Sequence, residues 1–230
     1  SYWIHREVDA YFVACERSRR ELALRHVPLE KIFVTGIPVN PDFAHREDTR
    51  QIRTRLGLDE NRKTVLMMGG GLGLVAYDKL VRSILKTESN AQIVSIVGAD
   101  GKRLDSLRSR LPSERVTVLG YVNNVHDWMN ASDVIVSKPG GLTCAEVLAR
   151  GLPFVMTSPL PGQEEVNVHY MLSSGAAVYA ESPRQVAEWV NTLLNSENAK
   201  EYLTSKALAF GRPNAVRDIV TLAVQNVGGA

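Results

Sequence analysis

Eight short apolar runs, separated by segments with helical spacing, constrain the fold of this 230-residue chain more than any other feature. The runs are rich in valine and isoleucine and lack strict alternation of apolar and polar residues, as is typical of parallel strands covered on both faces. They lie at residues 11–14, 32–35, 64–68, 93–97, 116–120, 134–137, 154–157 and 176–179.

The segments between these runs place apolar residues on one helical face, for example at Leu80, Ile84 and Leu85. Alternation of strands and helices predicts an α/β fold, a Rossmann-like, doubly wound parallel sheet built from βαβ units. Two prolines and polar residues between positions 37 and 48 indicate a domain boundary. We therefore expect residues 1–40 in one domain, a linker at 41–48, and a second domain at 49–230.

The overall charge and the cysteine content argue against several classes of protein. The chain has 27 Lys and Arg against 25 Asp and Glu, a net charge of +2, which does not favour nucleic-acid binding. No apolar run approaches the roughly 20 residues that span a bilayer. Cys15 and Cys144 lie far apart, which argues against disulfides and zinc and predicts a cytoplasmic protein. The five histidines lack metal-site spacing, so we expect no metal.

A glycine-rich segment, Gly69-Gly70-Gly71-Leu72-Gly73, follows the run at residues 64–68. Without side chains, the backbone there can turn sharply, approach a ligand and offer N–H groups to a phosphate. The segment is not a P-loop, because no Gly-Lys-Ser/Thr follows, and it fits the dinucleotide fingerprint poorly. A plain tight turn explains it equally well.

The segment Ser137-Lys138-Pro139-Gly140-Gly141-Leu142-Thr143 predicts a strand end, a turn, and a helix that begins near Leu142. The N–H groups of residues 141–143 would then be free at the positive end of the helix dipole. Such a helix terminus binds anions, and a diphosphate suits it. Lys138 can offset diphosphate charge, although we favour the interpretation that it is an exposed surface lysine.

Glu146 lies one turn into the same predicted helix. A carboxylate there can accept hydrogen bonds from both hydroxyls of a ribose, as acidic residues do in dinucleotide-binding folds. Compensation of the helix dipole is the common alternative. The preceding Gly140-Gly141 turn favours ligand binding.

Two further segments follow predicted strands. The segment Gly120-Tyr121-Val122 can meet the edge of a base, or it can end a strand with an aromatic plug. In the segment Pro159 to Asn167, the side chains of Gln163, Glu164 and Asn167 suit sugar hydroxyls, although an acidic helix start explains them as well. The short segment Asp127-Trp128-Met129 predicts an amphipathic helix whose Trp and Met are core residues.

Taken in order, these segments resemble one enzyme family. Its pattern continues through Arg150-Gly151-Leu152-Pro153 and Arg212-Pro213-Asn214-Ala215-Val216. From about Tyr11 to Val220, the chain is similar to the C-terminal half of the monogalactosyldiacylglycerol synthase and processive diacylglycerol glucosyltransferase family. That family (glycosyltransferase family 28) has the two-domain GT-B fold and is related to the peptidoglycan N-acetylglucosaminyltransferase.

The resemblance implies a donor site for UDP-galactose or UDP-glucose. The implied contacts are Gly140, Gly141, Leu142 and Thr143 with the diphosphate, Gly70 and Gly71 closing over it, Glu146 with the ribose, Gly120, Tyr121 and Val122 with the uracil, and Gln163, Glu164 and Asn167 with the donor sugar or adjoining phosphate. The implied reaction is an inverting displacement at the anomeric carbon by a hydroxyl of 1,2-diacylglycerol. Helix-terminus charge can stabilise the UDP leaving group, so we expect no cofactor and no metal.

The resemblance also implies what this chain lacks. Residues 1–40 match only the last strand-helix-strand of the N-terminal acceptor domain, and the final helix of the chain would pack back toward that domain. The catalytic base, a histidine, and the surface that meets an anionic membrane lie elsewhere in that domain. We identify no catalytic residue here, and His5 matches no base position. The full-length protein is expected at the inner face of the cell membrane, as a peripheral protein that binds no nucleic acid.

Two alternatives stay open. One is a non-catalytic UDP-sugar-binding module or a subunit of a split enzyme. The other is a peptidoglycan-type UDP-N-acetylglucosaminyltransferase or a 2-epimerase on the same fold. The segment Pro161-Gly162-Gln163-Glu164 favours a lipid glycosyltransferase over the second of these.

Overall fold

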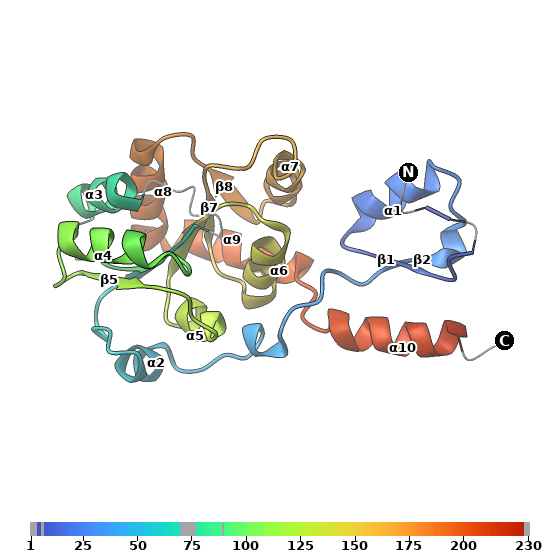
Figure 1. Ribbon diagram of the computed structural model, residues 1–230, viewed down its shortest axis with the longest axis horizontal. Helices are drawn as coiled ribbons and strands as arrows, with labels where there is room; N and C mark the ends of the chain where they lie inside the picture. Colours follow the sequence, from blue (N-terminus) through green and yellow to red (C-terminus); the bar gives the residue numbers. More distant parts are fainter. Residues whose placement is uncertain (1–3, 6, 70–76, 89, 228–230) are drawn as a thin grey trace. The chain divides into compact units, whose positions relative to one another are not determined.

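The computed structural model describes residues 4–5, 7–69, 77–88 and 90–227 of the chain. It contains two compact units, one formed by Ser1–Pro41 with Arg212–Ala230 and the other by Asp42–Gly211 (Figure 1). The segment after Gly211 thus groups with the amino-terminal residues. The functional role of each unit stays a prediction.

The first unit is built on two parallel strands, β1 (Tyr11–Val13) and β2 (Ile32–Val34), whose positions confirm the two amino-terminal runs. Helix α1 (Glu16–Ala23) and the 3₁₀ turn η1 (Leu29–Lys31) connect them. Helix α10 (Ala215–Val227) belongs to the same unit. Gly36, at a φ of 90°, lies so close to Arg212 that an added Cβ would be 2.5 Å from the Arg212 Cβ, so a larger residue does not fit.

The second unit contains a fully parallel, six-stranded sheet with the order β5-β4-β3-β6-β7-β8. All six strand predictions for this unit are confirmed to within one residue at either end. The strands are β3 (Thr64–Met68), β4 (Gln92–Ile96), β5 (Val116–Leu119), β6 (Val134–Ser137), β7 (Phe154–Met156) and β8 (Ala177–Tyr179). This order is that of the doubly wound fold expected from the sequence.

Eight helices of the second unit lie within the described residues and connect or follow these strands. They are α2 (Thr49–Arg55), α3 (Tyr77–Thr87), α4 (Gly101–Arg110), α5 (Val125–Asn130), α6 (Gly141–Arg150), α7 (Glu165–Ser174), α8 (Pro183–Asn195) and α9 (Glu197–Phe210). Helix α3 packs against α8, and α6 packs against α9.

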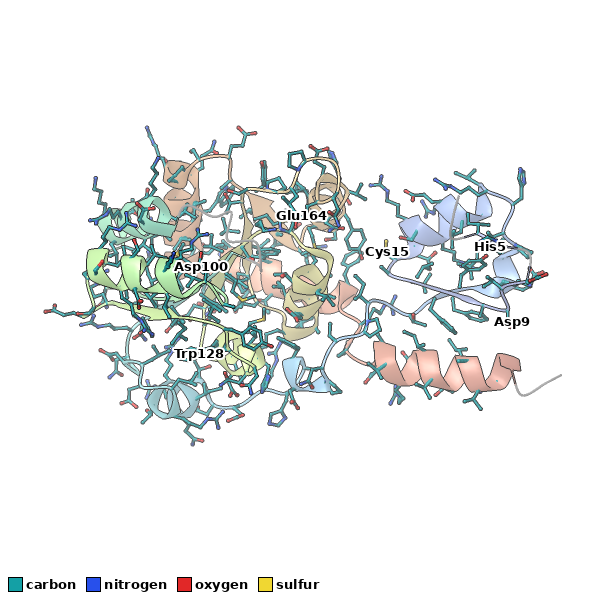
Figure 2. The ribbon with its side chains drawn as sticks, in the orientation of Figure 1. His5, Asp9, Cys15, Asp100, Trp128 and Glu164 are labelled. Atoms are coloured by element: carbon teal, nitrogen blue, oxygen red, sulfur yellow. The ribbon has the colours of Figure 1, made fainter. Side chains whose placement is uncertain are left out.

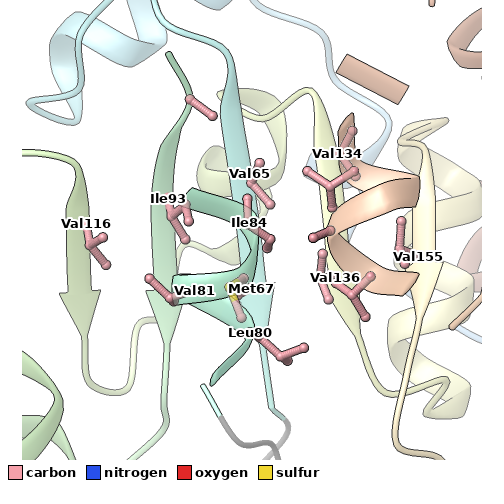
Figure 3. Close-up of a cluster of buried hydrophobic side chains, with 14 of the residues drawn as sticks. Val65, Met67, Leu80, Val81, Ile84, Ile93, Val116, Val134, Val136 and Val155 are labelled. Carbon is pink, nitrogen blue, oxygen red and sulfur yellow. The ribbon is translucent and has the colours of Figure 1, made fainter. Parts of the chain in front are cut away.

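The hydrophobic core lies on both faces of the sheet. On one face, Val65 of β3 and Ile93 of β4 lie in the same buried cluster as Val81 and Ile84 of α3 and Val134 of β6, and all five side chains are fully buried (Figure 3). The alternate residues Leu66, Ile135 and Phe154 are fully buried as well. Both faces are therefore covered, which explains why the strands read as continuous apolar runs without alternation.

Residues 41–48, expected to form a linker, begin with the 3₁₀ turn η2 (Pro41–Phe43). The Phe43 side chain is buried, and its ring meets the His126 ring edge to face at a centroid distance of 6.0 Å. Nearby, Trp128 and Met129 of α5 are buried, which confirms the prediction that they are core residues. None of the described helices is long and apolar enough to cross a membrane.

Candidate functional site

The strand order creates a topological switch point between β3 and β6. The chain proceeds from β3 through β4 to the β5 edge, then returns to β6 beside β3 and proceeds to the β8 edge. In open parallel sheets, ligands bind at such a point, beyond the carboxyl ends of the strands. The loop after β3 starts at the buried Gly69, whereas Gly70 and Gly71 lie outside the described residues. The loop after β6 is the Lys138-Pro139-Gly140 segment.

Helix α6 begins at Gly141, one residue before the predicted start, and its N-cap residue is Gly140. Two other helices after strands have side-chain caps: Asp100 accepts from Arg103 N of α4, and Ser182 accepts from Gln185 N of α8. Gly140 has no side chain with which to cap α6. The first N–H groups of a helix have no acceptor within it, so the amides of residues 141–143 can bind an anion.

Glu146 lies in α6, one turn beyond these amides, and its side chain is partly buried. Burial raises the pKa of this carboxyl to about 7. Among the described residues, no hydrogen bond or ion pair is made by the Glu146 carboxylate. A partly buried acceptor without an internal partner can accept hydrogen bonds from a ligand, as the ribose hypothesis requires.

Lys138 is not an exposed surface lysine, so that expectation was wrong. Lys138 as a whole is 7% exposed, and its Nζ donates a hydrogen bond to Oε1 of Glu164 at 3.1 Å. Both side chains of this ion pair are 8% exposed. The partner lies 26 positions later in the chain, on the loop after β7, which is why the local sequence gave no sign of burial.

The loops after β6 and β7 are held together by two further contacts. The Asn167 side chain donates to the carbonyl oxygen of Pro139 at 2.8 Å, and the amide N–H of Leu160 donates to Oε2 of Glu164 at 2.7 Å. Glu164 is the N-cap residue of α7, where Figure 2 labels it. The neighbouring Gln163 is exposed. Glu164 and Asn167 thus support the loop that carries the α6 terminus, while Gln163 faces solvent.

Cys144, in the first turn of α6, does not have the character of a nucleophile. Burial, with a further contribution from the negative charge of Glu164, raises the pKa of its thiol to about 12. The thiol therefore stays protonated at neutral pH and acts as a small apolar group.

The segment Gly120 to Val122 follows β5 at the same edge of the sheet. Tyr121 is 77% exposed, which argues against the aromatic plug that we considered and leaves its ring available to a ligand. An added Cβ at Gly120 would lie 3.5 Å from the carbonyl oxygen of Gly98, so the turns after β4 and β5 are close neighbours. Strands β4 and β3 separate β5 from β6.

The described part of the predicted site thus lies along one edge of the sheet. The structure brings residues 138–146 together with residues 160–167, and it places residues 120–122 along the same edge, three strands away. Within the described residues, no group of three His, Cys, Asp or Glu side chains could hold a metal ion. That the reaction needs neither metal nor cofactor stays a prediction.

Comparison with known proteins decides the family. A family model described as "Glycosyl transferases group 1" matches residues 48–209. The chain belongs to this glycosyltransferase family. The description of the matching model is "group 1" and does not mention glycosyltransferase family 28. The curated relatives have the names of the family that the sequence motifs resemble.

One relative, the processive diacylglycerol beta-glucosyltransferase of Staphylococcus epidermidis, is 32% identical over 90% of this chain and 53% of its own length. Another, a probable chloroplastic monogalactosyldiacylglycerol synthase 2 of Oryza sativa, is 35% identical over 95% of this chain and 48% of its own length. The recognition of this family from sequence motifs is therefore confirmed. The chain spans about half the length of the curated relatives it matches.

The fold is shared with solved structures of much lower identity. The Anabaena protein Alr3699/HepE, solved in complex with UDP and glucose, is 14% identical, has a TM-score of 0.65, and aligns over 94% of this chain and 62% of its own chain. The predicted Rossmann-like sheet of a GT-B glycosyltransferase is thus confirmed.

Proposed function

We propose that this chain is the donor-binding part of a glycosyltransferase that transfers a hexose from a UDP-sugar to 1,2-diacylglycerol with inversion. The observation that carries the proposal is the α6 terminus at the switch point, where the first amides of the helix, at residues 141–143, are followed by the Glu146 carboxylate, which has no partner among the described residues. Amides and carboxylate stand one helical turn apart, which suits a diphosphate and the ribose next to it.

The donor is UDP-glucose or UDP-galactose. The named relatives include a glucosyltransferase and a galactolipid synthase, so relatedness supports either hexose. The diphosphate binds the amides of residues 141–143 and the ribose binds Glu146. The uracil lies by Gly120, Tyr121 and Val122, while the sugar lies toward Gln163. The resemblance also implies Gly70 and Gly71 in this site, and both lie outside the described residues.

The developing negative charge on the departing UDP is stabilised by the α6 terminus, because its amide dipoles already point at the leaving group. No metal or cofactor is needed for that role. The catalytic base, the diacylglycerol site and the surface that meets an anionic membrane belong to the amino-terminal half of the full-length protein. That protein acts at the cytoplasmic face of the membrane.

Calorimetric titration of the chain with UDP, UDP-glucose and UDP-galactose tests donor binding. We expect UDP and one of the two UDP-hexoses to bind, and GDP-mannose to bind at least about tenfold more weakly, because the uracil is read separately. Equal affinity for GDP-mannose and for the UDP-hexose that binds would contradict the assignment of the uracil subsite.

An assay of the full-length protein with each UDP-hexose and diacylglycerol vesicles tests the transfer. Formation of glycosyldiacylglycerol supports the proposal. Donor binding without product from any UDP-hexose would favour a non-catalytic binding module. Transfer of N-acetylglucosamine in place of a hexose would favour the peptidoglycan-type activity.

A further inference from the structure

A negatively charged side chain lies beside the proposed diphosphate site. An added Cβ on Gly140, the N-cap residue of α6, would lie 3.6 Å from Oε1 of Glu164. The Glu164 charge also contributes to the raised pKa of Cys144 in the first turn of α6. A carboxylate at this place would repel a diphosphate, which has two negative charges, unless another group neutralises it.

Lys138 is placed to do so. It precedes the Pro139-Gly140 turn directly, and its buried Nζ lies 3.1 Å from Oε1 of Glu164, while Oε2 accepts from Leu160 N. The two carboxylate oxygens of Glu164 therefore have different partners. Of these two partners, the Lys138 ammonium group is charged and the Leu160 amide is neutral. An ammonium group has three donors, and within the described residues only one is used.

We propose that Lys138 is the charge-compensating positioning residue of the donor site, which neutralises Glu164 and directs its remaining donors toward the diphosphate. This inference rests on the proposed function, because it assumes that the α6 terminus binds UDP. The alternative is that Lys138 only connects the loops after β6 and β7. The Asn167 bond to Pro139 already joins the same loops without any charge.

The two roles predict different dependence on ligand charge. Loop tethering affects every ligand of the site, whereas charge compensation affects a ligand in proportion to its own charge. UDP and uridine share the base and the ribose and differ in the diphosphate. Their affinities, measured side by side by NMR titration of the chain, separate the two roles.

We expect Lys138→Met to weaken UDP binding about tenfold or more and to change uridine binding less than about twofold. Glu164→Gln should tighten UDP binding several-fold, because it removes the repelling charge. The double variant Lys138→Met/Glu164→Gln should bind UDP better than Lys138→Met does. Lys86→Met is the matched control, since Lys86 is exposed in the last turn of α3 and should leave both affinities unchanged.

Equal weakening of UDP and uridine in Lys138→Met, or no gain in the double variant, would overturn the proposal. If Lys138→Met does not fold, Glu164→Gln and the double variant decide, because they differ only at Lys138. If Glu164→Gln binds UDP more tightly than the double variant does, the inference is supported. If these two variants bind UDP equally, it is overturned. Failure of the unaltered chain to bind UDP would instead contradict the proposed function itself, before any variant is compared.

Discussion

At the amino edge of the sheet, where the parallel strands begin, the principal buried carboxylate is paired within the protein. At the carboxyl edge, the Glu146 carboxylate has no such partner among the residues that the structure describes. Asp133, just before β6, accepts from Arg53 Nη2 at 2.6 Å and from the amide of Thr64 at 2.8 Å. Lys200 Nζ lies 3.4 Å from its other oxygen. Gln92, at the start of β4, is likewise bonded to Thr64 and to the Asp59 backbone.

The carboxyl edge of the same sheet leaves groups available. The amides at the start of α6 have no side-chain cap from Gly140, and Glu146 has no partner among the residues that the structure describes. Unpaired buried polar groups cost stability, so a fold retains them where a ligand uses them. The contrast supports a stabilising role for the amino edge and agrees with the proposed donor binding at the carboxyl edge.

The largest effect is expected at the amino edge. Asp133→Ala leaves the Arg53 guanidinium buried without its carboxylate and should lower the free energy of unfolding by about 3–5 kcal/mol. Urea denaturation measures the loss. Lys200→Met is the control, because this partly exposed partner should contribute less than about 1 kcal/mol. A small loss in Asp133→Ala would remove the stability role of this edge.

At the carboxyl edge, Glu146→Ala should weaken UDP binding by about 1–3 kcal/mol, the free energy typical of hydrogen bonds to a charged group. Calorimetry at pH 8 measures the affinity. Glu197→Ala is the matched control, since Glu197 is an exposed acidic residue in the first turn of α9. Unchanged UDP affinity in Glu146→Ala would exclude the ribose contact.

The raised pKa of Glu146 predicts that UDP-glucose affinity depends on pH. Hydroxyl donors favour the ionised carboxylate, whose pKa in the free chain is about 7, so affinity should rise about tenfold from pH 6 to pH 8. The diphosphate diester keeps its charge over this range. Glu146→Gln should show a flat profile, and a parent profile equally flat would contradict the prediction.

The same pKa has the opposite consequence for the stability of the free chain. The folded state holds the Glu146 proton more tightly than the unfolded state does, because its pKa is raised from 4.5 to about 7. This group's contribution to stability is therefore greatest below pH 4.5 and is lost as pH rises through about 7. Glu146→Gln should accordingly stabilise the free chain at pH 8, whereas Asp133→Asn should destabilise it. If both substitutions change the free energy of unfolding in the same direction, the contrast between the two edges does not hold.

The smallest expected effect is at the uracil subsite. Tyr121 is 77% exposed, so Tyr121→Ala should change the free energy of unfolding by less than about 0.5 kcal/mol. UDP binding should weaken by about 1 kcal/mol or less, through loss of ring contact with the base. Fluorescence or calorimetric titration measures this, with the exposed Tyr202 of α9 as the control position. A loss as large as that in Glu146→Ala would place Tyr121 at the centre of the site.

Local sequence predicted the strands and the α6 terminus because the information is local. A parallel strand covered on both faces needs a continuous apolar run, and the strand at residues 134–137 matches its run at both ends. The Gly140-Gly141 pair fixed the start of α6 to within one residue, because a turn and an uncapped helix both favour glycine there.

The contacts that span the sequence were not predictable in this way. Lys138 meets Glu164 across 26 positions, and Arg53 meets Asp133 across 80. Each residue type is common on surfaces, so burial follows only from the strand order that brings the two segments together. The 3₁₀ turn that contains Phe43, buried against His126, lies in the segment expected to be a linker, and its burial was not predictable for the same reason.

We propose above that UDP binds the carboxyl edge through the first amides of α6. An NMR titration of the isotope-labelled chain with UDP tests it at the atoms concerned. We expect the amide signals of Gly141, Leu142 and Thr143 to shift most, while that of Thr64, bonded to Asp133 at the opposite edge, stays in place. Saturable UDP binding that leaves these three signals unshifted would contradict the claim.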